Sequence, residues 1–334
     1  MNAKHSELSR YDEMCNATAA QVIKNYSTSF HAATCLYPST IRRDIRNLYA
    51  VVRIADEIVD GAHSQAFNHK LHDQALQTNK KPATNSADNY GPAEPEYAAR
   101  RQALDAYEVS VLQAPHHRFH TDPILHAYSS TARRCGFASE HLAAFFNSMR
   151  MDISHASFND AELADYIYGS AEVIGLLCLD IFFADQPQRS CEQRNLLCTG
   201  ARRLGAGFQK LNFLRDYVDD RSTRQRDYYP SLRGGANTET FRQLLDEVHA
   251  DLAAGQETIK LLPHNVQPAV RAATFMYADL AKRLAKNPAA ALNNGRQHRR
   301  ISVPNYRKFT LLAQSLATTG VAVTRTKIRR SSPS

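Results

Sequence analysis

One stretch of the chain, QKLNFLRDYVDD, places an amide and two carboxylates on one side of a predicted helix. Asn212, Asp216 and Asp220 are four residues apart, and Gln209 lies three residues before Asn212. Side chains at this spacing are neighbours on an α-helix, with Cβ atoms about 5–6 Å apart. Carboxylates one turn apart repel each other unless a cation lies between them, and oxygen ligands favour a hard ion such as Mg²⁺. This stripe is either a solvated helix face or a metal site.

A second polar stripe occurs upstream, in the sequence YAVVRIADEIVD. It has the same spacing, borders an apolar stripe, and consists of Tyr49, Arg53, Asp56 and Asp60. Two such helices facing each other would gather four carboxylates around Mg²⁺ ions, which in turn would hold a diphosphate, because Mg²⁺ binds through a few carboxylates plus substrate phosphates. Arg53 and Arg215 suit direct phosphate contact, since a guanidinium donates two parallel hydrogen bonds. The pair of stripes therefore favours the metal site.

At this point the chain resembles a known family, the squalene/phytoene synthases, which are head-to-head trans-isoprenyl diphosphate synthases. The resemblance covers roughly residues 25–310 and is carried by four ordered segments: YSTSF (26–30), RNLYAVVRIADEIVD (46–60), YIYGSAEVIGLLCLDIF (166–182) and FQKLNFLRDYVDD (208–220). It implies an all-α fold, a single isoprenoid-synthase-type helical bundle with a central cavity. The two acidic helices would face each other across its mouth.

The resemblance also implies roles for individual residues. The metal ligands would be Asp56, Asp60, Asn212, Asp216 and Asp220, and the four acids would be catalytic together with Tyr166. Diphosphate and prenyl groups would contact Ser27, Ser29, Phe30, Tyr49, Arg53, Gln209, Asn212, Arg215, Tyr277, Arg300, Ala171, Ile174 and Gly175.

Some of these residues also have a plainer explanation. Ser27 and Ser29 could cap a helix, because hydroxyl groups accept hydrogen bonds from the first amides of a helix. Ala171 and Gly175 are small, so they could let a neighbouring helix approach rather than open a tunnel for prenyl chains. For both groups the sequence leaves the two explanations open.

The chain departs from the family pattern in two places. Many relatives have Lys where Thr28 stands, which removes one expected phosphate contact. Gln225 replaces a Gly that is usual in relatives, and Asp227 would put an extra negative charge beside the expected phosphate region. We expect the second departure to alter the local turn.

Among family members the chain most resembles bacterial phytoene synthases. These join two geranylgeranyl diphosphates through a cyclopropylcarbinyl (prephytoene) diphosphate to phytoene, releasing diphosphate, early in carotenoid biosynthesis. The resemblance implies Mg²⁺ or Mn²⁺ as cofactor and no NADPH. The near alternative is squalene or dehydrosqualene synthase, acting on two farnesyl diphosphates, with NADPH needed for squalene. Further alternatives are a terpene cyclase on the same scaffold and a non-catalytic assembly or binding protein.

Composition places the chain among folded proteins. Its 334 residues are 43% hydrophobic and 22% charged, with helical periodicity along most of the length. We expect a polar N-terminal segment (1–20), one helical domain (21–318) containing an exposed loop (77–96), and a disordered basic tail (319–334).

The charge and the cysteines bear on partners and location. The net charge is +8, but no nucleic-acid motif accompanies it, so nucleic acid is not an expected partner. The six cysteines show no C-x-x-C spacing, and residue 1 is not followed by a signal-peptide pattern. We expect a cytoplasmic protein, with peripheral contact to the inner membrane face possible because prenyl products partition into lipid. The oligomeric state is not predicted.

Overall fold

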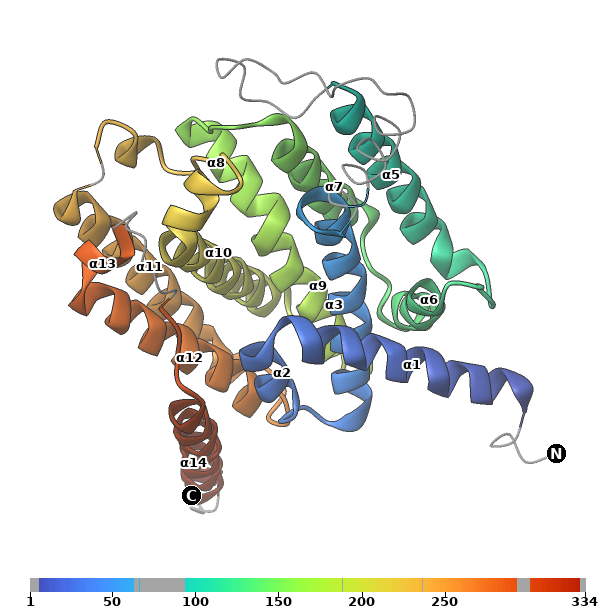
Figure 1. Cartoon of the computed structure of the whole chain (residues 1–334). Helices are drawn as coiled ribbons and strands as arrows, with labels where there is room; N and C mark the ends of the chain where they lie inside the picture. The colour runs from blue at the N-terminus through green and yellow to red at the C-terminus, as the bar shows by residue number, and fades with distance from the viewer. Residues whose placement is uncertain are drawn as a thin grey trace.

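The structure, a computed structural model, describes residues 6–62, 66, 94–187, 189–235, 237–292 and 301–330. Within these ranges there is no β-strand, which confirms the all-α prediction. The main helices, shown in Figure 1, are α1 (Glu7–Tyr26), α2 (Thr28–Thr34), α3 (Ser39–Asp60), α5 (Glu94–Gln113), α6 (Pro123–Cys135), α7 (Ser139–Ser154), α8 (Asp160–Ile167), α9 (Val173–Phe183), α10 (Cys191–Ser222), α11 (Thr238–Thr258), α12 (Gln267–Lys286), α13 (Pro288–Leu292) and α14 (Asn305–Arg330).

Local sequence sets where several of these helices begin and end. The Asn159 side chain accepts the amide of Glu162, whose carboxylate accepts the amide of Asn159, so a capping box starts α8. The Asp122 side chain caps α6 by accepting the amides of Ile124 and Leu125, and Gly136 ends that helix with a φ of 63°. A positive φ favours glycine, because glycine has no Cβ. These caps fix the lengths of the helices around the site.

The long helix α10 lies in the middle of the bundle and packs against α9 and α11 (Figure 1). Small residues permit this contact. A Cβ added to Gly175 would lie 2.5 Å from the carbonyl oxygen of Ala201, and one added to Gly205 would lie 2.5 Å from that of Ala171. For Gly175 and Ala171 the structure therefore favours the packing explanation over a tunnel lining.

The central helix expected over residues 166–182 is present but not regular along its length. A π-helical turn, Tyr168–Glu172, separates α8 from α9. The stretch Asp160–Phe183 is long and apolar enough to cross a membrane by length and composition, and 44% of its most apolar window is buried inside the protein. Buried core helices pass the same test, and this stretch packs against α7 and α10.

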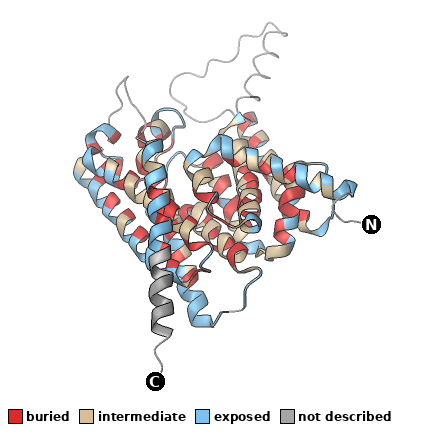
Figure 2. Cartoon of the chain, turned by 90° about the horizontal axis from the view of Figure 1, so that it is seen from below, coloured by how far each residue is buried: buried red, intermediate tan, exposed pale blue. Residues whose placement is uncertain are grey.

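The structure differs from the expected division of the chain in three places. Residues 7–20 are not a separate polar segment, because they belong to α1, in which Cys15 and Ala19 are fully buried. Figure 2 shows the buried residues of the chain gathered where the helices meet. The segment 77–96 ends in helix, since α5 begins at Glu94, and its part 77–93 lies outside the described residues. Helix α14 continues to Arg330, into the segment for which we expected disorder.

Candidate active site

The two acidic stripes meet at one arginine. Arg224, just past the end of α10, donates from Nη1 to Asp220 Oδ1 at 2.6 Å, and its Nε lies 3.9 Å from Asp60 Oδ2. Asp60 is the last residue of α3 and Asp220 lies in the last turn of α10. The structure therefore brings the two stripes together at the ends of their helices.

Two further carboxylates are paired with an arginine of their own stripe. Arg53 Nη1 lies 2.6 Å from Asp56 Oδ2, and the same guanidinium binds Glu57 and stacks on the ring of Tyr26, 4.1 Å from its centroid. Arg215 binds Asp216 with two hydrogen bonds, of 2.9 and 2.6 Å. These arginines balance the acidic charge and also present the planar donors that suit phosphate oxygens.

Asp60 has a second and more buried partner, Arg226. The Arg226 guanidinium binds both carboxylate oxygens of Asp60, with Nη1 to Oδ2 at 2.6 Å. It also donates to the carbonyl oxygen of Asp152 at 2.8 Å, and its Nη1 lies 3.2 Å from the Asp152 carboxylate. Arg226 is only 6% exposed, so this ion pair lies in the interior.

Tyr166 is connected to this ion-pair network. Its hydroxyl donates to Asp152 Oδ2 at 2.7 Å, and the hydroxyl of Tyr228 donates to Asp152 Oδ1 at 3.1 Å. The Tyr166 ring lies 5.1 Å from Phe158 and 5.8 Å from Phe213, centroid to centroid. Tyr166 thus hydrogen-bonds the Asp152 carboxylate, which in turn faces Arg226. Aromatic rings enclose Tyr166.

Burial shifts the acids of the site toward their protonated forms. It raises the pKa of Asp56, while Arg53 opposes the shift. It raises the pKa of Asp220 to about 6 and that of Asp152 to about 7, although Arg224 and Arg226 lower them. An added cation would counteract this effect, because a positive charge favours the ionised carboxylate.

The donors of the second stripe fit a hard divalent ion. The Asn212 side chain donates to Gln209 Oε1 at 3.4 Å, but the Asn212 Oδ1 atom is buried and has no hydrogen-bond partner. Such an orphaned acceptor is costly unless a cation or donor satisfies it. Within the described ranges, no three His, Cys, Asp or Glu side chains are close enough to hold a metal unaided. The acids lie beside arginines, as Asp56 does beside Arg53 and Asp216 beside Arg215. Mg²⁺ would have to share these ligands with substrate phosphates.

The segment YSTSF forms the start of α2. Ser27 caps this helix, its Oγ accepting the amide of Phe30 at 3.4 Å, so the plainer explanation holds for Ser27. Thr28 Oγ1 accepts a hydrogen bond from Lys308 Nζ of α14 at 2.9 Å. Lys308 therefore places an ammonium group beside position 28. Ser29, the residue after Thr28, is half-buried.

Aromatic residues of the expected substrate site pair across helices. The rings of Phe30 and Tyr49 lie 5.8 Å apart, and those of Phe208 and Tyr277 stack at 4.0 Å. Burial raises the pKa of Tyr49 to about 12. Ile174 is half-buried against the core. Arg300, also expected at the site, lies outside the described residues.

The segment after α10 contains Gln225 and Asp227, where the chain departs from the family pattern. Gln225 has a φ of 55°, a left-handed conformation that glycine adopts more freely than a residue with a Cβ. The carboxylate of Asp227 lies 3.8 Å from Arg221 and 3.9 Å from Arg233, so these arginines balance its charge. The backbone of Asp227 forms an isolated bridge with Ser157.

Sequence reasoning missed three arginines. Arg224 and Arg226 follow the second acidic stripe in the stretch RSTRQRDYY, where the density of arginines was the available signal. Arg46 lies three residues before Tyr49, so the first stripe extends one turn further than we assigned. The Arg46 Nε atom is buried without a hydrogen-bond partner.

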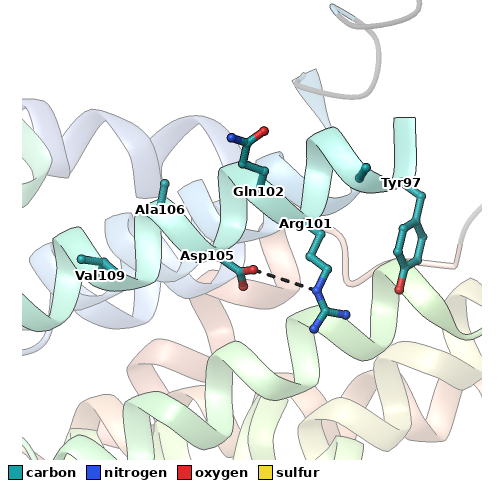
Figure 3. Close-up of a pocket in the computed structure, with 7 residues that line it drawn as sticks. Tyr97, Arg101, Gln102, Asp105, Ala106 and Val109 are labelled. Atoms are coloured by element: carbon teal, nitrogen blue, oxygen red, sulfur yellow. Dashed lines mark ion pairs between the residues drawn. The ribbon is translucent and has the colours of Figure 1, made fainter. Parts of the chain in front are cut away.

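Two surface hollows lie away from these residues. One, of about 590 Å³, runs along α5 past the 3.9 Å ion pair of Arg101 and Asp105 (Figure 3). The other, of about 330 Å³, is lined by residues of α8, α10 and α11 and includes Lys210 and Asp251, which are 2.9 Å apart. Neither is lined by a side chain of the two acidic stripes.

Comparison with known proteins agrees with this fold. The chain is 27% identical over 227 residues to a bifunctional lycopene cyclase/phytoene synthase of Neurospora crassa, covering 66% of this chain and 36% of that protein. It is 24% identical to a protein of the same description from Phaeosphaeria nodorum (78% and 45% covered) and 24% identical to a 4,4'-diapophytoene synthase of Staphylococcus haemolyticus (60% and 57%). The chain thus spans about half or less of the length of these fungal relatives.

Solved structures show the same architecture. A dehydrosqualene synthase in complex with ligand superimposes with a TM-score of 0.69 at 18% identity, covering 94% of this chain and all of the other. A squalene synthase from Alicyclobacillus acidocaldarius gives 0.60 at 19% identity, covering 85% and 96%. The model of one family, squalene/phytoene synthase, matches residues 23–307. This chain therefore belongs to the squalene/phytoene synthase family.

Proposed function

We propose that this protein is a phytoene synthase. It joins two geranylgeranyl diphosphates head to head, through a cyclopropylcarbinyl diphosphate, to phytoene. The two steps release two diphosphates and two protons, so no reductant is consumed and no NADPH is needed. The observation that supports this best is the contact of Arg224 with both Asp220 and Asp60, because one guanidinium then lies beside the ends of both acidic stripes.

The arginines and acids of the two stripes would bind and orient the diphosphates. Arg53, Arg215 and Arg224 are each partly exposed and already lie beside a carboxylate. When a diphosphate enters, its oxygens accept hydrogen bonds from these guanidiniums, which leaves the carboxylates and Asn212 Oδ1 facing the entering group. Bound Mg²⁺, or Mn²⁺, would neutralise the negative charge that develops on the leaving diphosphate.

Aromatic residues would protect the reacting carbons. The faces of Phe30 and Tyr49 stabilise an allylic cation without forming a bond to it, because an aromatic ring is negative at its face. Tyr166 is held by Asp152, so its hydroxyl is engaged and does not trap the cation as a nucleophile would. The enclosing rings of Phe158 and Phe213 exclude water, which would otherwise quench the cation.

A second candidate is dehydrosqualene (diapophytoene) synthase, which would act on two farnesyl diphosphates by the same steps. The specific observation is the relative from Staphylococcus haemolyticus, which is described as a 4,4'-diapophytoene synthase. The same acids and arginines serve both reactions. The two candidates therefore differ in prenyl chain length and not in the diphosphate site.

The test is to incubate purified protein and Mg²⁺ with farnesyl or geranylgeranyl diphosphate, with and without NADPH, and to identify the extracted hydrocarbons by mass. We expect a C40 product from geranylgeranyl diphosphate without NADPH. A C30 product alone would replace the proposal by its second candidate, and a cyclised C15 or C20 product would point to a terpene cyclase. No product from either substrate would favour a binding protein.

A further inference from the structure

The guanidinium of Arg53 is held by three side chains. Its Nη1 lies 2.6 Å from Asp56 Oδ2, its Nη2 donates to Glu57 Oε1, and its Cζ lies 4.1 Å from the ring centroid of Tyr26. The Nε atom of Arg53 is buried and has no hydrogen-bond partner, so one donor of the group is still unsatisfied. Arg53 is therefore held on one face and at two of its nitrogens, with capacity for a further acceptor.

The two carboxylates that contact Arg53 are not equivalent. The Asp56 side chain is 38% exposed and belongs to the first acidic stripe. The Glu57 side chain is only 16% exposed, and its second oxygen, Oε2, accepts the amide of Ala62 at 3.0 Å, just beyond the end of α3. Because Glu57 is also bound to the backbone, its contact with Arg53 is the lasting one. The contact of Asp56 is the one that an entering anion can replace.

The third contact comes from Tyr26, the last residue of α1. This helix crosses α3 and packs on it (Figure 1). The next residue, Ser27, ends α1 with its amide and caps α2 with its hydroxyl, so the backbone beside the ring is fixed. The Tyr26 ring is 50% exposed, and one of its faces lies on the guanidinium of Arg53. A cation is attracted to the negative face of an aromatic ring, so this contact holds the guanidinium rather than filling the core.

Holding Arg53 in one orientation matters for binding an anion. A free arginine side chain has many rotamers, and a ligand that binds it must first order them. Tyr26 and Glu57 order the side chain in advance, which lowers the entropic cost of binding. Neither residue belongs to the two polar stripes, so both would act through Arg53.

We propose that Tyr26 and Glu57 are positioning residues for Arg53. They keep its guanidinium beside the first acidic stripe while a diphosphate oxygen takes the place of the Asp56 carboxylate at Nη1. This inference rests on the proposed function, because it needs a prenyl diphosphate at this stripe. A purely structural role, which joins α1 to α3, would affect stability and leave the affinity for diphosphate unchanged.

The test compares Glu57→Gln, Tyr26→Leu and Tyr26→Phe. Binding of inorganic diphosphate in the presence of Mg²⁺ is measured by isothermal titration calorimetry, and KM is measured by diphosphate release from geranylgeranyl diphosphate. We expect Glu57→Gln and Tyr26→Leu to weaken diphosphate binding and to raise KM, each by roughly threefold to tenfold. Tyr26→Phe keeps the ring over Arg53 and should bind diphosphate as the wild type does.

The matched control is Glu108→Gln on α5. The Glu108 side chain is 14% exposed and binds Arg150 of α7, a helix that carries neither stripe. This variant breaks an ion pair of similar burial, so it should leave diphosphate binding unchanged. A double-mutant cycle gives a second readout. In the Arg53→Gln background, Tyr26→Leu should have little further effect on diphosphate binding, because the ring acts through the guanidinium.

Four outcomes would overturn the inference. They are no binding of diphosphate by the wild type, unchanged affinity in Glu57→Gln and Tyr26→Leu, an equal loss in Glu108→Gln, and additive losses in the Arg53→Gln background. If the two variants lose affinity for diphosphate while no prenyl diphosphate is turned over, the proposed function fails and the positioning role stands. If the wild type forms hydrocarbon and the variants bind diphosphate equally well, the positioning role fails and the proposed function stands.

Discussion

Arg226 binds both carboxylate oxygens of Asp60 across 166 residues of sequence. This contact attaches the end of the first acidic helix to the segment that follows the second. Because Arg226 also binds the carbonyl and carboxylate of Asp152, the same guanidinium fixes α3, α7 and the chain after α10 relative to one another. The relative position of the two acidic stripes therefore depends on one buried cation.

Removing that cation should destabilise the protein strongly. Arg226→Gln leaves Asp60 and Asp152 without their buried partner, and breaking a buried ion pair costs about 3–5 kcal/mol. Adding Asp60→Asn to this variant should recover part of the loss, which a double-mutant cycle by denaturant unfolding measures. The control is Arg101→Gln, whose exposed pair with Asp105 contributes under about 1 kcal/mol. Equal losses for Arg226→Gln and Arg101→Gln would contradict this account.

Gln225→Gly should stabilise the protein. The φ of 55° at Gln225 strains any residue with a Cβ by about 1–2 kcal/mol. Glycine relieves this strain but lowers the free energy of unfolding by about 0.4–1 kcal/mol, because it gives the unfolded chain more entropy. The exposed Gln225 side chain forms no contact that offsets this strain. We expect a net gain of about 0.5–1 kcal/mol in the free energy of unfolding. Gln225→Ala, which keeps the Cβ, should show no gain; equal behaviour of the two variants would refute the explanation.

Stability should decrease as pH rises through the titration of Asp220. Burial raises its pKa from 3.8 to about 6, so between these values the folded state holds a proton that the unfolded state has released. Below pH 4 the raised pKa of Asp220 thus stabilises the folded state. This contribution, on the order of 1–3 kcal/mol, is lost as the pH rises to 6. Asp220→Asn removes this titration, so its stability relative to wild type should increase from pH 4 to pH 7.

Mg²⁺ supplies the control for that pH dependence. If Asp220 is a metal ligand, Mg²⁺ at pH 7 should raise the melting temperature of the wild type more than that of Asp220→Asn, because binding to the folded state stabilises it. If the two proteins differed in stability by the same amount at every pH, with or without Mg²⁺, Asp220 would neither titrate in this range nor bind the ion.

Lys308 should contribute to substrate binding at the position where Thr28 lacks a cation. A hydrogen bond from an ammonium to a charged group contributes about 1.5–3 kcal/mol, so Lys308→Met should raise KM for the prenyl diphosphate by roughly tenfold or more. The double variant Thr28→Lys, Lys308→Met should restore KM, because it returns the ammonium to the same place from α2. The control is Lys282→Met on the exposed side of α12. A double variant no better than the single one would sink the idea.

The sequence predicts the fold well because helical periodicity and ordered motifs are local features. The two polar stripes lie on α3 and α10 as their spacing requires, and Tyr166 is joined to Asp60 of the first stripe through Asp152 and Arg226. The aspartates, however, are paired with arginines. Their partners, such as Arg226, come from an irregular segment whose path no period in the sequence reveals.

Other differences have similar physical causes. The π turn at Tyr168–Glu172 has the same apolar pattern as a regular helix, so the sequence does not reveal it. Lys308 reaches Thr28 across 280 residues, and only the folded chain reveals that contact. Residues 1–20 looked too polar to pack, yet Cys15 and Ala19 within this segment are fully buried on one face of α1.

The central claim is that the acids on α3 and α10 act on a bound diphosphate. The most direct measurement is diphosphate release from geranylgeranyl diphosphate with Mg²⁺, for Asp56→Asn, Asp216→Asn and the control Asp219→Asn, a neighbouring acid off the stripe. We expect release to fall by about 100-fold or more in the first two variants, because each loses a carboxylate that would hold Mg²⁺ against the leaving diphosphate. Release should persist in the third variant. Unchanged release in Asp56→Asn or Asp216→Asn, with the fold intact by circular dichroism, would contradict the claim.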